Sequence, residues 1–134
     1  MIDWRTVLDL DGYESRPGVD VQTVQRAESK LGRRLPSDLV PLYRDSDGVL
    51  DLGGEWFVIW PIEMLVAENL ARWDASDLPR HLLAFGDDGA GYPFCLQDHQ
   101  PPVICWYPIE EEGTVLAPDI ESFWRGWTSG SITT

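Results

Sequence analysis

Basic residues are scarce in this sequence. Ten Lys and Arg stand against 23 Asp and Glu, which gives a formal net charge of −13. This charge would repel the phosphates of nucleic acids and the anionic lipids of a membrane surface, so we expect neither as a partner. A basic protein surface is the natural complement, and acidic charge that serves solubility alone is the alternative.

Long apolar runs and closely spaced cysteines are also missing. No stretch approaches the ~18 apolar residues that span a bilayer, and Asp3, Arg5 and Asp9 occupy the place where a signal peptide needs an apolar segment. We therefore expect a cytoplasmic protein. The two cysteines, Cys95 and Cys105, lack C-x-x-C spacing, so we expect reduced thiols, no structural disulfide and no zinc site.

Apolar residues are plentiful. They make up 43% of the chain and include seven Trp, which is enough for a packed interior. A division of 134 residues into two units would leave each too small for a core, so we expect one domain over residues 1–134.

Four segments carry apolar side chains at helical spacing, and polar or glycine residues bound several of them. They are residues 20–32 with Asp20 as N-cap and Gly32 as the C-terminal stop, residues 37–48 with Asp47 and Gly48 as the stop, residues 62–73, and residues 119–127 with Asp119 as N-cap.

Short β-branched and aromatic runs predict strands over residues 55–60, 82–85, 92–97, 103–107 and 114–117. We expect the third and fourth of these to form a hairpin through residues 98–102. With Gln100 at its apex, Cys95 would face Cys105 on one side of the sheet. The predicted fold class is α+β, a mainly antiparallel sheet packed against N-terminal, middle and C-terminal helices.

The tryptophans could also form a carbohydrate or peptide platform. Periodicity places most of them on apolar faces and leaves Trp4, and Trp56 or Trp60, as candidate surface rings.

Signatures of catalysis are missing as well. The glycines of residues 85–91 run G-x-x-G-x-G before a strand, which favours a tight turn over a phosphate loop. Residues 45–48 fail as a calcium loop, and His81 and His99 belong to no H-E-x-x-H or nucleophile signature. We therefore expect a protein that is not an enzyme and that needs no cofactor or metal.

Two acidic groups could act as paired catalytic carboxylates, although neighbouring acids are usually solvated surface. We interpret them instead as candidate contacts for a basic protein partner. The candidate partner-binding residues are Asp87, Asp88, Glu110, Glu111 and Glu112.

Four segments in order along the chain carry a family resemblance. They are residues 27–36 (AESKLGRRLP), 42–48 (LYRDSDG), 83–91 (LAFGDDGAG) and 122–124 (SFW). In these segments the chain resembles the Smi/Knr type of the SUKH superfamily.

The resemblance implies an α+β fold and a role without catalysis. Bacterial members are thought to act largely as immunity proteins that bind and neutralise polymorphic toxins, often nucleases, and fungal relatives are regulatory scaffolds linked to cell-wall glucan synthesis. A basic toxin domain is therefore the expected partner. A regulatory scaffold and a small-molecule binder or undetected enzyme remain the alternatives.

Overall fold

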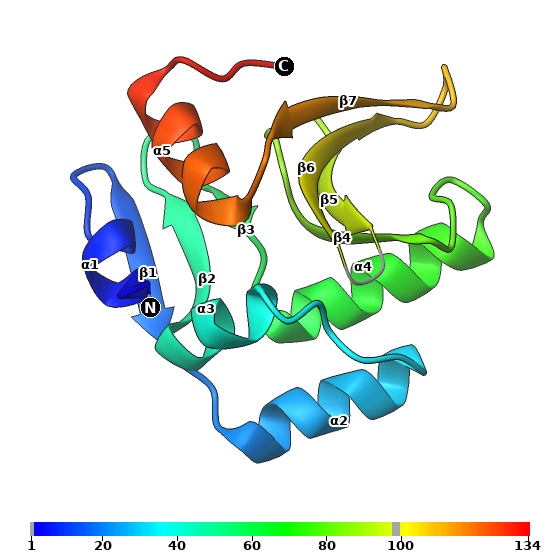
Figure 1. Ribbon diagram of the computed structural model, residues 1–134, viewed down its shortest axis with the longest axis horizontal. Coiled ribbons are helices and arrows are strands. Elements are labelled where there is room, and N and C mark those ends of the chain that lie inside the picture. Colours follow the sequence, from blue (N-terminus) through cyan, green and yellow to red (C-terminus); the bar gives the residue numbers. More distant parts are fainter. Residues whose placement is uncertain (1, 98–99) are drawn as a thin grey trace.

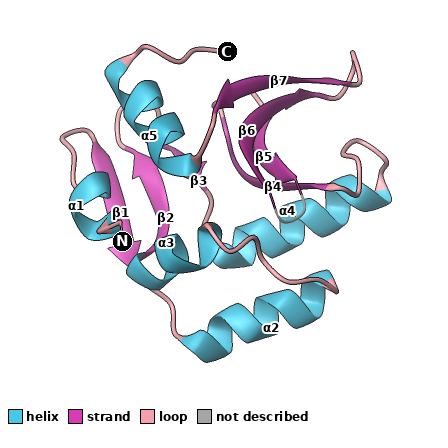
Figure 2. Cartoon of the chain, viewed as in Figure 1, coloured by secondary structure: helices cyan, strands magenta, loops and turns pink. Residues whose placement is uncertain are grey.

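The computed structural model describes residues 2–97 and 100–134, and this part of the chain forms five helices and seven strands (Figure 1, Figure 2). The helices are α1 (Trp4–Leu8), α2 (Val21–Leu31), α3 (Leu39–Asp45), α4 (Ile62–Asp74) and α5 (Ile120–Ser129). The strands are β1 (Tyr13–Pro17), β2 (Ser46–Asp51), β3 (Trp56–Ile59), β4 (Leu82–Asp87), β5 (Pro93–Gln97), β6 (Gln100–Tyr107) and β7 (Glu112–Ala117). None of the described helices is long and apolar enough to cross a membrane.

All seven strands form one antiparallel sheet in chain order, so β1 and β7 are its edges. Figure 1 shows α4 running beneath β4, α5 on the other side of the sheet, and α2 outermost below α4. The predicted α+β fold with helices around an antiparallel sheet is confirmed.

Two predicted helices begin where their N-cap residues indicate, and the first also ends at the glycine expected as its stop. The Asp20 side chain accepts a hydrogen bond from the backbone amide of Thr23 at 2.8 Å, and Gly32 ends α2 with a φ of 73°. The Asp119 side chain caps α5 in the same way, accepting from the amide of Ser122 at 2.7 Å. Both signals are local in sequence, which is why the pattern alone reveals them.

The prediction that Asp47 and Gly48 end the second helix is wrong. α3 ends at Asp45, and Asp47 and Gly48 belong to β2. Gly48 has a φ of 88°, and a Cβ there would lie 2.7 Å from the backbone nitrogen of Pro61, so glycine permits a close approach of two chain segments. The Asp47 carboxylate accepts from the amide of Ile62 at 2.8 Å and so caps α4 instead.

The predicted hairpin strands are present, but their register is wrong by one residue. Cys95 pairs with Ile104 and Cys105 with Phe94, so the two cysteines lie on opposite faces of the sheet. Gln100 pairs with Gln97 within the ladder instead of forming the apex, and an irregularity in the pairing between Leu96 and Gln97 leaves a net slip of one residue. Residues 98 and 99 of the predicted loop lie outside the described residues.

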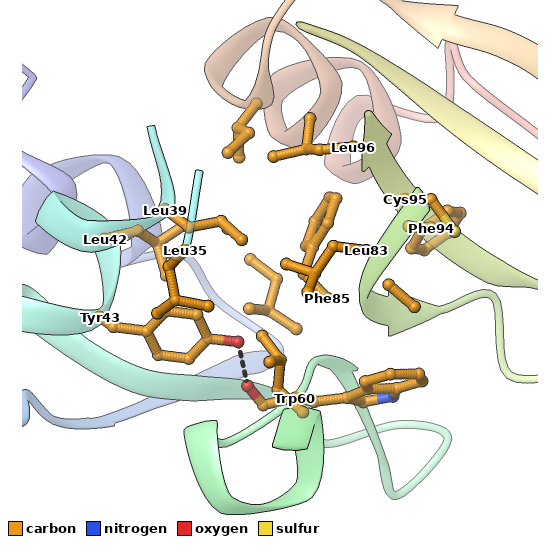
Figure 3. Close-up of a cluster of buried hydrophobic side chains, with 14 of the residues drawn as sticks. Leu35, Leu39, Leu42, Tyr43, Trp60, Leu83, Phe85, Phe94, Cys95 and Leu96 are labelled. Carbon is orange, nitrogen blue, oxygen red and sulfur yellow. Dashed lines mark hydrogen bonds between the residues drawn. The ribbon is translucent and has the colours of Figure 1, made fainter. Parts of the chain in front are cut away.

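The core joins the sheet to α3 and α4. The close-up in Figure 3 shows side chains of α3 facing those of β4 and β5. At its centre the hydroxyl of Tyr43 donates to the backbone carbonyl of Trp60 at 2.6 Å. Of the three candidate surface rings, Trp4 and Trp60 are buried and Trp56 is partly exposed, so the assignment of Trp4 or Trp60 to the surface is wrong. Aromatic residues here serve packing, with Phe94 and Phe123 4.6 Å apart between ring centroids.

β4 has little strand contact on its β3 side, where Ile59 and Gly86 form the pairing of these two strands. Side chains of α4 occupy the remaining length. Asn69, fully buried, donates to the carbonyl of Ala84 at 2.7 Å and accepts from its amide at 2.8 Å. One turn later the indole of Trp73 donates to the carbonyl of Leu82 at 3.0 Å. α4 therefore completes the hydrogen bonding that a neighbouring strand would otherwise supply.

Candidate partner-binding surface

Asp87 lies at the end of β4 and holds the turn that follows. Its Oδ1 accepts from the amide of Gly89 at 2.7 Å and its Oδ2 accepts from the indole of Trp60 at 2.8 Å. Its backbone carbonyl accepts from the indole of Trp56 at 3.2 Å. Gly89 and Gly91 have φ values of 85° and 98°, which confirms a tight turn that needs glycine.

Asp88 is also engaged within the chain. Its Oδ1 accepts from the amides of Ala90 and Tyr92, at 2.9 and 3.1 Å. Its Oδ2 accepts from the hydroxyl of Thr134 at 2.7 Å, which ties the last residue to the turn. Partner binding by Asp87 and Asp88 stays a prediction, and a charge reversal at either position would also break the turn.

The three remaining candidates, Glu110, Glu111 and Glu112, are exposed, and we call these three residues the acidic turn. Glu110 and Glu111 lie between β6 and β7, and Glu112 is the first residue of β7. Among the described residues none of their carboxylates has a hydrogen-bond or salt-bridge partner. Glu111 has a φ of 54°, so it shapes the turn through its backbone. These carboxylates are therefore free to interact with a cation outside the chain.

The strand pairings bring both acidic groups to the same end of the sheet. Asp87 pairs with Pro93 at the start of β5, and Tyr107 at the end of β6 pairs with Glu112. The rings of Tyr92 and Tyr107 lie 4.9 Å apart between these two pairs. The sequence candidates thus share one rim, with two tyrosines between them, although only the acidic turn offers unpaired charge.

A groove of about 780 Å³ between α2 and α4 is a feature that the sequence reasoning missed. Two of its carboxylates already have partners: Asp47 caps α4, and Asp20 caps α2. The hydroxyl and amide of Thr23 hydrogen-bond to Asp20 and lower its pKa. The apolar stripes of α2 and α4 were the available signal, because Ala27 of α2 lines this groove together with four apolar residues of α4: Ile62, Val66, Ala67 and Leu70.

Convergent polar groups with altered protonation would favour a small-molecule site in that groove. The pKa of Asp20, which lines the groove, is lowered, and this shift follows from its helix-capping hydrogen bonds to Thr23.

The two thiols are poor nucleophiles. Both are fully buried, and burial raises the pKa of Cys95 well above its ordinary value and that of Cys105 to about 11. Both therefore stay protonated at neutral pH, whereas a nucleophilic cysteine needs its thiolate. Within residues 2–97 and 100–134, no three His, Cys, Asp or Glu side chains cluster as a metal site requires. The predicted absence of metal and of catalysis remains to be measured.

Comparison with known proteins agrees with the resemblance in the sequence. A model of the SMI1 / KNR4 family (SUKH-1) matches residues 18–126, from the loop before α2 into α5. No curated protein matches the chain. Because the matched segment covers most of the sheet and four of the five helices, the chain belongs to the SMI1/KNR4 family (SUKH-1).

Proposed function

We propose that this protein is an immunity protein, without enzymatic activity, that neutralises a toxin by binding its basic toxin domain. Membership of the SMI1/KNR4 family supports the coarser description, a general immunity-protein or Smi1-type domain. The observation that carries the finer proposal is the acidic turn, three exposed carboxylates without partners among the described residues, in a chain of net charge −13.

Electrostatics explains why such a surface would suit a toxin that attacks nucleic acid. A nuclease must carry positive charge to hold a phosphate backbone, and an acidic protein can use that field to speed encounter. Bound over the same region, it would also block access of the nucleic acid. The buried, protonated thiols and the capped carboxylates support a role without catalysis.

The test measures association with a toxin domain encoded beside the gene, by stopped flow over a range of ionic strength. Association should slow as salt rises from tens of millimolar toward 0.5 M, since the Debye length falls from roughly 20 Å to about 4 Å. Changing the acidic turn to lysine, Glu110→Lys, Glu111→Lys and Glu112→Lys together, should slow association at least tenfold at low salt.

The matched control makes the same charge change elsewhere. Asp9, Asp11 and Glu14 are exposed and lie at the α1–β1 end, which Figure 1 places across the molecule from the β6–β7 turn. Replacing these three with lysine should slow association far less. If the two triple variants slow association equally, the acidic turn contributes only through the net charge of the protein.

Failure of every neighbouring toxin to bind or to be neutralised would contradict the proposed function. Turnover of a generic ester or phosphate substrate by the purified protein would contradict the absence of catalysis.

A further inference from the structure

β7 is an edge strand whose outer side is open. Its pairing partner is β6, and in the described part of the chain no strand pairs with its other side. Residues 112–115 are exposed, and burial begins only at Leu116 and Ala117. An open edge presents unpaired amide and carbonyl groups, which can hydrogen-bond to an additional strand. In Figure 1, β7 lies at the upper right margin of the molecule.

The other edge strand, β1, is protected in ways that β7 is not. β1 contains Arg16 and Pro17. Proline and basic residues are common devices against strand addition. β7 contains neither, and Glu112 at its start is its one charged residue.

Exposed apolar side chains accompany the open edge. Val115 within β7 is 62% exposed, and Ile109 in the preceding turn is 89% exposed. Alternate side chains of an added strand could pack against a β-branched residue such as Val115, while backbone hydrogen bonds would supply most of the affinity.

The charge of the acidic turn indicates which kind of segment would bind beside β7. The acidic turn lies at the start of β7, so an added strand would have one of its ends beside three unpaired carboxylates. We propose that the partner inserts an extended segment that pairs with β7 as an eighth strand, with basic residues at the end next to the acidic turn. This inference rests on the proposed function, since it names how the toxin domain would be held.

The first experiment introduces the missing edge protection. Val115→Lys in the full chain should raise the Kd for the neighbouring toxin domain at least tenfold, because a lysine on an edge strand opposes strand addition. Leu52→Lys is the matched control: Leu52 is 49% exposed in the turn between β2 and β3, and its replacement should change Kd less than twofold.

The second experiment measures the protection of the backbone amides of β7. Hydrogen exchange measured by NMR on the free protein and on the complex should show new protection at alternate amides of β7, which side-chain contact alone would not produce. Strand addition is overturned if the complex forms while hydrogen exchange in β7 stays unchanged and Val115→Lys changes the Kd less than twofold. That result leaves the proposed function intact. Absence of any complex overturns both.

Discussion

Asn69 acts as a substitute for a strand beside β4, and replacing it tests that role. Its buried amide group pairs with both backbone groups of Ala84, at 2.7 and 2.8 Å, and also donates to the carbonyl of Leu65 at 2.8 Å. Asn69→Leu keeps a side chain of similar reach and suits a helix, but it leaves the amide and carbonyl of Ala84 without partners.

The free energy of unfolding that Asn69→Leu would lose follows from these hydrogen bonds. A buried backbone group left unpaired costs about 1–3 kcal/mol, so two groups should lower the free energy of unfolding by about 4 kcal/mol. The better helix propensity of leucine would offset only a few tenths of a kcal/mol. Domains of this kind unfold with about 5–15 kcal/mol, so the variant should remain folded but lose on the order of 10–15 °C in Tm.

Urea titration followed by tryptophan fluorescence and far-UV circular dichroism measures this change, with an unchanged slope m. Trp73→Phe removes one bond, to the carbonyl of Leu82, and should cost about 1–2 kcal/mol. Asn69→Asp keeps the shape but directs a carboxylate at the carbonyl of Ala84, so at pH 7 it should be at least as harmful as leucine. An Asn69→Leu variant within about 1 kcal/mol of the parent would refute the reasoning.

Three further outcomes follow from the packing. A Cβ at Gly86 would overlap the backbone of β3, so Gly86→Ala should abolish folding. Gly32 has open space around it and a φ of 73°, so Gly32→Ala should lower the free energy of unfolding by only about 1–2 kcal/mol in the same titration. Cys95 and Cys105 should react with a thiol reagent at pH 8 at least 100-fold more slowly in the native state than in urea, and equal rates would contradict their burial. Burial raises the pKa of Tyr43 well above 10.0, so the unfolded chain ionises first, and the unfolding free energy should fall as pH rises above about 10; Tyr43→Phe should weaken that dependence.

Elements whose signals are local in sequence could be predicted closely. The helix capped by Asp20 and Gly32 needs only its own residues, because a cap acts within one turn. Strand β1 was not predicted, and neither was the position of Asp47 and Gly48 within β2. Both depend on pairing with a segment that is distant in the sequence. Asp-Gly is common in helix stops and in bends of strands alike, and only the approach of Pro61 decides between them here.

The candidate site residues also differ in whether the sequence alone could predict their surroundings. The exposure of Glu110, Glu111 and Glu112 could be predicted, because a run of acids beside a glycine favours a solvated turn. The engagement of Asp87 and Asp88 could not, because their partners Trp60 and Thr134 are 27 and 46 residues away in the chain.

The order of the strands adds what charge alone does not show. Because β7 is the last strand of the sheet, the free carboxylates of the acidic turn adjoin an edge with unpaired backbone groups, while Asp87 ends β4 inside the sheet. A one-residue slip in the β5–β6 register would move side chains to the other face but would leave β7 at the edge. The wrong register therefore misplaced the cysteines without altering which acidic residues adjoin the open strand. Edge position, more than the count of carboxylates, distinguishes the acidic turn from the other acidic residues as a place for a partner to bind.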